Sequence, residues 1–261
     1  MISDELREYA EVPDRFAPVP PGTSVTRFDD GRICVLQGAT WASISGPRFD
    51  ERELEDVLAL VHELIPSEKR RVWWIGPGAR PGRLGESLLA RGFTLAGDGP
   101  EVRAMVLINA PPELPPGVEV RRVAGYDDFV AAREVQWEAF AVPDDRRAAQ
   151  REHMRTEYDE AAEHGVPVTF IASLEGRPAA TGMAIPSNRG IFLVAGATAA
   201  WARGRGLYRA LVRARWDYAV ERGTPALVTD AIVTTSYPIL RRIGFDEVCT
   251  IRRYEEPARE A

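Results

Sequence analysis

The segment 191–222 constrains the fold most, because an apolar run changes there into a helical pattern through a short loop of glycines and arginines. Residues 191–198 are apolar and include branched and aromatic side chains, which predicts a buried strand. Beyond the loop, apolar residues recur three or four positions apart on one face of a predicted helix 209–222, and Gly223 has the position of a C-capping glycine. The residues of that apolar face are Leu207, Ala210, Leu211, Ala214 and Tyr218.

The loop between this strand and this helix has the composition of an anion-binding site. The first backbone N–H groups of a helix have no partner within it and lie at the positive end of its dipole, where a phosphate binds well. Glycine leaves room for the phosphate, and the guanidinium group of arginine matches its oxygens. A glycine-rich turn without a ligand is the alternative. We expect a pyrophosphate to bind at Arg203, Gly204, Arg205, Gly206, Leu207 and Tyr208.

Two common phosphate-binding motifs do not fit this loop. No Lys-Ser or Lys-Thr pair follows the glycines, as a Walker loop requires, and Arg209 stands where a dinucleotide-binding fingerprint has its third glycine. The loop instead resembles the acyl-CoA loop of the GNAT acetyltransferase superfamily, Arg/Gln-x-x-Gly-x-Gly/Ala. Arg203, Gly206 and Tyr208 occupy its fixed places, and Tyr208 departs from the usual Gly or Ala.

The order of predicted elements also resembles that superfamily, over residues 118–256. A strand, two helices and an antiparallel meander precede the loop, and a strand, a helix, Gly244-Phe245 and a last strand follow its helix. The resemblance implies the GNAT fold, an α/β (α+β) class with a mixed, mostly antiparallel sheet flanked by helices. The predicted strands are 118–123, 168–174, 177–186, 191–198, 226–229 and 248–254, and the predicted helices are 127–140, 143–164, 209–222 and 235–243.

The first half of the chain resembles a GNAT module without the arginine–glycine loop. Residues 72–93 have the order strand, loop, helix, Gly-Phe that recurs at 226–245, which we interpret as an internal repeat. The glycine loop 76–82 is expected to be structural, because Pro77 and Pro81 lack the N–H groups that a phosphate needs. The proline-rich connector 109–117 separates a predicted degenerate GNAT-like domain, 1–110, from a predicted GNAT N-acetyltransferase domain, 118–261.

The rest of the first half yields simpler expectations. Residues 1–31 are rich in Pro, Asp and Arg and are expected to wrap the surface, and 33–44 reads as a strand or hairpin arm. Asp50 and Glu53 form a predicted capping box ahead of the helix 54–64.

Composition limits the partners and the compartment. The net charge of −6 argues against nucleic acid as a partner and is compatible with a cationic amine. The uncharged stretch 190–202 is 13 residues, and the longest one, 33–47, is 15 residues, so both are too short to span a membrane; residues 1–11 carry no apolar signal segment. Cys34 and Cys249 are expected to be free thiols. These features predict a cytoplasmic protein without a membrane partner.

The resemblance implies acyl transfer from acetyl-CoA to an amine. It places the pantetheine arm and the thioester at the backbone of Gly196, Ala197 and Thr198, whose N–H groups would stabilise the developing oxyanion.

The catalytic residues are less well defined by the sequence. The superfamily commonly has a tyrosine proton donor at the position of Leu240; Tyr237, three residues earlier, is the candidate substitute or else a packed core residue. Asp230 is the candidate general base or else a loop-capping aspartate. Glu134 and Glu138 either recognise a cationic amine or are solvated, and the three histidines lack metal-type spacing.

Two classes of function follow. The first is an acetyl-CoA-dependent N-acetyltransferase acting on a primary amine of a small molecule or a protein, with a longer acyl donor or a thiol-precursor acceptor as a variant. The second is a CoA-binding sensor without turnover, which Leu240 favours. The oligomeric state stays open. Gly206→Val is predicted to abolish CoA affinity and to leave the fold intact, because its side chain would intrude on the phosphate.

Overall fold

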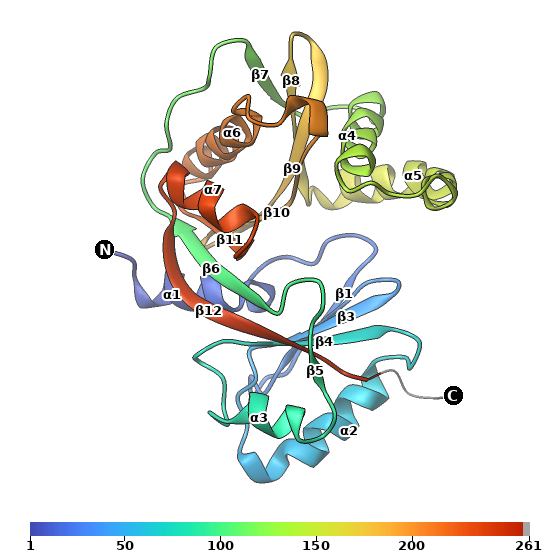
Figure 1. Cartoon of the computed structure of the whole chain (residues 1–261), viewed down its shortest axis with the longest axis vertical. Coiled ribbons are helices and arrows are strands. Elements are labelled where there is room, and N and C mark those ends of the chain that lie inside the picture. The colour runs from blue at the N-terminus through green and yellow to red at the C-terminus, as the bar shows by residue number, and fades with distance from the viewer. Residues whose placement is uncertain (258–261) are drawn as a thin grey trace. The chain divides into compact units, whose positions relative to one another are not determined.

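The computed structural model describes residues 1–257, which form two compact units (Figure 1). The first unit contains Met1–Val106, Asp230–Arg242 and residues 246–257. The second contains Leu107–Thr229 and Ile243–Phe245. The division into domains 1–110 and 118–261 remains a prediction, and the compact units differ from it by assigning most of the C-terminal segment to the first unit.

The sheet of the second unit has the strand order β7-β8-β9-β10-β11. Its neighbours are antiparallel, except that β10 and β11 are parallel. This arrangement confirms the predicted meander and the mixed, mostly antiparallel sheet. The strands are β7 Val118–Arg122, β8 Val168–Leu174, β9 Arg177–Ser187, β10 Gly190–Thr198 and β11 Leu227–Ile232, of which residues 227–229 belong to this unit.

Helices cover both faces of this sheet. The helices are α4 Tyr126–Ala139, α5 Asp144–His164, the short 3-10 helix η3 Ala200–Ala202 and α6 Leu207–Glu221. Figure 1 shows α4 and α6 on opposite sides of β8 and β9, and both pack against β8, β9 and β10. The predicted apolar stripe explains the packing of α6, because Leu207, Ala210 and Leu211 are at most 1% exposed.

The sheet of the first unit has the order β1-β2-β3-β4-β12-β6, with β5 beside β12. Only β3 and β4 are parallel neighbours in it. The C-terminal strand β12 therefore completes this sheet between β4 and β6, which the sequence did not indicate. The strands are β1 Ser24–Arg27, β2 Cys34–Gln37, β3 Trp41–Ser45, β4 Arg70–Ile75, β5 Thr94–Leu95, β6 Glu101–Leu107 and β12 Asp246–Glu255.

The helices of the first unit are α1 Asp4–Glu11, η1 Pro13–Arg15, η2 Glu51–Glu53, α2 Leu54–Leu64, α3 Leu84–Leu89 and α7 Ser236–Ile243. The capping box of Asp50 and Glu53 is confirmed ahead of α2. The expectation that residues 1–31 only wrap the surface is wrong in part, because α1 buries Leu6, Tyr9 and Ala10. Three apolar residues at i, i+3 and i+4 within a charged segment were enough to form that face.

Candidate functional site

The predicted strand–loop–helix junction is formed by β10, η3, the loop 203–206 and α6. Gly206 is the N-cap of α6. Gly204 and Gly206 have φ of +76° and +81°, in the left-handed region that favours glycine. The two glycines are thus required by the path of the backbone, whatever the loop binds.

The N-terminus of α6 has a group of backbone amides to which the described part of the chain offers no backbone acceptor. The first intrahelical hydrogen bond runs from the amide of Ala210 to the carbonyl of Gly206, at 3.0 Å. Within residues 1–257, no backbone carbonyl accepts a hydrogen bond from the amides of Gly206, Leu207, Tyr208 or Arg209. These amides lie at the positive end of a helix of 15 residues, which is the geometry of an anion-binding site.

The two strands beside this junction separate early. β10 and β11 pair only at Ile191↔Leu227 and Phe192↔Val228. Beyond Phe192 the two strands form no further residue pair within residues 1–257, and the last link between them is the Thr229 hydroxyl, which donates to the carbonyl of Leu193 at 3.0 Å. Of the three residues expected to bind the pantetheine arm, Gly196 is exposed, Thr198 is half-buried and Ala197 is buried.

A bulge in β10 accompanies this separation. Its register with β9 passes from Val194↔Met183 to Ala197↔Thr181, so that two residues of β10 oppose Gly182 alone. Ala195 in the bulge has φ of +52°, an uncommon value for a residue with a side chain. Backbone strain of this kind is often retained at functional sites.

The arginines of the loop differ in their contacts. The Nε of Arg203 donates to the carbonyl of Thr198 at 3.3 Å, and its Nη2 donates to that of Ala139 at 3.5 Å. Arg203 thus ties the loop to the end of β10 and to α4. Arg205 is exposed. Arg209, whose place in the sequence only excludes a dinucleotide fingerprint, is a further cation at the first turn of α6, and its Nε is buried without a hydrogen-bond partner among residues 1–257.

The connector between the halves also reaches the loop. A Cβ at Gly206 would lie 2.9 Å from the Cγ of Pro115. Arg213 of α6 holds the same connector through the Glu113 carboxylate at 2.7 Å. The expectation that Gly206→Val would leave the fold intact therefore needs correction. Valine would have to adopt the left-handed φ of this position, and its Cβ would meet Pro115.

Asp230 lies in β11, within the first unit, and the pKa of its carboxyl is raised. Burial raises its pKa from 3.8 to about 7; the charge of Asp14 adds to the rise and Arg253 opposes it. Its Oδ1 has no hydrogen-bond partner among residues 1–257. A loop-capping aspartate would use its oxygens, so this environment favours a proton acceptor over a cap. Asp14 of η1 has a pKa raised to about 6, again chiefly by burial, and no sequence signal marked it.

Tyr237 lies in α7, also within the first unit. Its hydroxyl donates to Oε2 of Glu247 at 2.8 Å, and this hydrogen bond is the main cause of a raised pKa. The residue is not a packed core tyrosine, because its ring is only partly covered. Leu240, in the usual tyrosine position, is 0% exposed.

The glutamates expected to meet an amine are on α4. Glu134 accepts a hydrogen bond from Nη2 of Arg151 on α5 at 2.7 Å. Glu138 is exposed. Glu134 is therefore engaged in a surface ion pair, which favours the solvated alternative for this residue.

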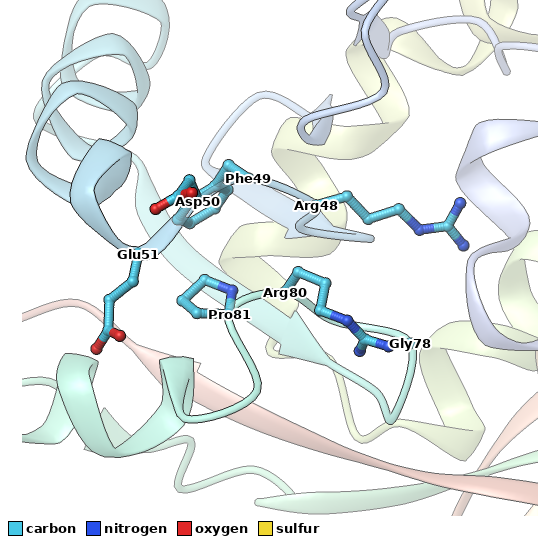
Figure 2. A pocket seen from close by; sticks show the side chains of 7 residues that line it. All are labelled: Arg48, Phe49, Asp50, Glu51, Gly78, Arg80 and Pro81. Carbon is cyan, nitrogen blue, oxygen red and sulfur yellow. The ribbon is translucent and has the colours of Figure 1, made fainter.

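The first unit contains a counterpart of the strand–loop–helix junction, at β3 and α2, that differs in its strand pairing and at its helix N-terminus. β3 and β4 stay paired over five residue pairs, and a bridge between Arg48 and Arg80 continues the pairing. The carboxylate of Asp50 accepts at the helix N-terminus where a phosphate would bind. Figure 2 shows the open pocket of about 790 Å3 beside this bridge, lined by residues that include Arg48, Asp50, Glu51 and Arg80.

The glycine loop 76–82 of this half binds one of the chain's own carboxylates. The amide of Gly78 donates to Oε1 of Glu11 at 2.7 Å. A Cβ at Gly76 would lie 2.4 Å from the same oxygen. These contacts support the structural role expected for the loop.

Three further features concern metal binding, membrane spans and the cysteines. No group of three or more metal-ligating side chains occurs within residues 1–257. In the same part of the chain, none of the helices has the length and apolar character needed to cross a bilayer. Cys34 and Cys249 are free, and burial raises the pKa of each thiol, to about 11 and about 12.

Comparison with known proteins identifies the fold. No protein-family model matches the sequence, and no curated protein matches it either. A GCN5-related N-acetyltransferase from Kribbella flavida superposes with a TM-score of 0.63 at 16% identity, covering 96% of this chain and 93% of that one. One from Sphaerobacter thermophilus gives 0.60 at 19% identity, covering 99% and 86%.

A tandem GNAT protein from the clavulanic acid biosynthesis pathway is also similar. It gives a TM-score of 0.59 at 14% identity and covers 98% of this chain and 88% of its own. The chain therefore has the GNAT fold with two GNAT-like halves, as the sequence predicted.

Proposed function

We propose that this protein is an N-acetyltransferase that transfers the acetyl group of acetyl-CoA to a primary amine of a small molecule or a protein. The observation that carries the proposal is the set of unpaired amides at Gly206–Arg209, on the same unit as strands that separate after two residue pairs. An anion docks at such amides, and an extended ligand arm can pair with the free side of β10.

The counterpart in the first half makes the assignment more specific. There the strands stay paired and Asp50 occupies the helix N-terminus, so a phosphate would meet a carboxylate. One cofactor site per chain, in the second unit, follows from this contrast.

The proposed roles of individual residues are those that the resemblance to the GNAT superfamily implies. Acetyl-CoA supplies the thioester that the amine attacks. The amides of Gly196 and Ala197 would stabilise charge on its carbonyl oxygen. Asp230, whose pKa of about 7 suits a base near neutral pH, would take the proton of the amine. Tyr237 is the proposed proton donor to the departing thiolate.

A titration of CoA into the protein, followed by calorimetry, tests the site. Arg205→Gln should raise the dissociation constant at least threefold, because the exposed guanidinium lies in the loop, where it can reach a phosphate. Arg146→Gln, an exposed arginine on α5, is the matched control and should leave it unchanged. Equal affinities of both variants and the wild type would contradict the proposed site.

The second function, a CoA-binding sensor without turnover, rests on the buried Leu240 in the usual tyrosine position. Release of free thiol from acetyl-CoA on addition of a panel of amines separates the two functions. Thiol release that depends on an amine supports the enzyme. Binding of acetyl-CoA without release for any amine supports the sensor.

A further inference from the structure

The bulge of β10 is contacted by two side chains of α6, Tyr208 and Arg215. They are seven residues apart and so lie on one face of the helix, the face that packs on the sheet. In the register of β9 with β10, Gly182 alone opposes Ala195 and Gly196. Tyr208 meets Gly196 and Arg215 meets Gly182, so the two contacts converge on the two sides of one bulge.

Both contacts depend on glycine in the strand. A Cβ at Gly196 would lie 2.8 Å from Cε2 of Tyr208, and a Cβ at Gly182 would lie 2.8 Å from Nη1 of Arg215. Neither glycine has a φ in the left-handed region. The space needed by the two side chains, and not the backbone conformation, therefore explains glycine at both positions.

The burial of the Arg215 guanidinium beneath α6 is energetically unfavourable. It is 1% exposed and forms no ion pair with any side chain of residues 1–257. Its Nε donates to the carbonyl of Leu211 at 3.0 Å and its Nη1 to that of Met183 at 3.3 Å, while Nη2 has no partner. Burial of a cation without a carboxylate is unfavourable. The hydrogen bond from Arg215 to Met183 links α6 to β9 next to the bulge.

The same guanidinium lies beside the ring of Tyr208. Its carbon is 6.0 Å from the ring centroid. Burial raises the pKa of Tyr208, and the positive charge of Arg215 opposes the rise. Tyr208 is half-buried, with Gly196 and the Arg215 guanidinium beside its ring, so an added Cβ at Gly196 must displace the ring, the bulge or the first turn of α6.

We propose that Tyr208 and Arg215 are positioning residues that hold the β10 bulge, so that the amides of Gly196 and Ala197 stay in place for the thioester arm of CoA. This inference rests on the proposed function. It also explains why the chain has Tyr208 where the superfamily usually has Gly or Ala. The large ring at position 208 fits because the residue opposite it in β10, Gly196, has no side chain. The exchange of small and large residues between strand and helix keeps the total volume constant.

The first test is a compensating pair of substitutions. Gly196→Ala should raise the dissociation constant of acetyl-CoA at least tenfold, and Gly196→Ala combined with Tyr208→Ala should bind at least fivefold more tightly than Gly196→Ala alone. Gly125→Ala is the matched control, because Gly125 has φ of −149° and no atom within 4 Å of its Cβ position. All titrations are made well below the lowest melting temperature of the set.

The second test separates positioning from general destabilisation. Arg215→Met should raise the dissociation constant of acetyl-CoA at least fivefold and change that of 3′-phospho-ADP, which lacks the pantetheine arm, less than twofold. Arg215→Lys should recover part of the loss. A loss shared equally by both ligands would indicate a merely structural role and overturn the inference.

The outcomes also separate this inference from the proposed function. A wild-type protein that does not bind acetyl-CoA overturns both. A wild-type protein that binds it, with a double variant no better than Gly196→Ala, overturns the positioning role alone.

Discussion

Replacement of Asp230 by asparagine should stabilise the protein above neutral pH and leave its stability nearly unchanged at about pH 4. The carboxyl has a pKa of about 7 in the folded protein, against 3.8 for the ordinary group. The folded state therefore binds the proton more tightly than the unfolded state. The stability this gives is complete below about pH 4 and is lost as the pH rises through about 7.

The magnitude follows from the size of the shift. About three pH units at about 1.4 kcal/mol each set a ceiling of about 4 kcal/mol. Because the residue is partly accessible to solvent, we expect about 2 kcal/mol. Asparagine mimics the protonated acid, and the Oδ1 of Asp230 has no hydrogen bond to lose within the described residues. Asp14 shifts the pH dependence of the wild type in the same direction, with a pKa of about 6.

The assay is urea unfolding of wild type and Asp230→Asn at about pH 4 and about pH 8.5, on the two sides of the expected titration. The variant should match the wild type within about 0.5 kcal/mol in acid and exceed it by about 2 kcal/mol in base. Asp29→Asn, an exposed loop aspartate of the same unit, should show no such difference. A variant that is less stable than the wild type by the same amount at both pH values would refute the raised pKa.

Three further predictions concern the loop and the last helix. Gly206→Ala should lower the free energy of unfolding in urea by about 1–2 kcal/mol, because alanine disfavours a left-handed φ. Adding Pro115→Ala should restore part of this loss, because it removes the Cγ that would lie 2.9 Å from the new Cβ. A double variant with the same urea midpoint as Gly206→Ala would contradict the contact. Leu240→Tyr should lower stability by about 1–3 kcal/mol through overpacking, since Leu240 is fully buried; a melting temperature equal to the wild type would show room for the larger ring. Tyr237→Phe should change stability by less than about 0.5 kcal/mol but lower kcat about 100-fold if its hydroxyl protonates the thiolate; an unchanged kcat would remove Tyr237 from the mechanism.

The structure also changes how one substitution is to be interpreted. Loss of CoA affinity in Gly206→Val was expected to report on the phosphate alone. Because Pro115 and the left-handed φ also disfavour a side chain there, Arg205→Gln is the cleaner probe of the loop.

The sequence by itself determined the features that depend on local interactions. Helix α6 and its unpaired first-turn amides follow from the spacing of apolar residues and from the i to i+4 hydrogen-bond rule, which involve residues close in the chain. The capping box at Asp50 and the antiparallel meander are local in the same sense. The order of these elements, together with the resemblance of the loop 203–208 to the acyl-CoA loop of the superfamily, predicted the GNAT fold and its tandem form.

Only the tertiary structure decided the features that depend on pairing between distant segments. The position of β12 between β4 and β6, the bulge opposite Gly182 and the contact of Tyr208 with Gly196 involve strand registers that local patterns do not encode. Arg215 falls on the apolar face between Leu211 and Tyr218, so its burial could have been read from the helical spacing, but its role required the strand beneath it. The pKa of Asp230 belongs to the same class, because burial and the charge of Asp14 arise from segments more than 200 residues apart in the sequence.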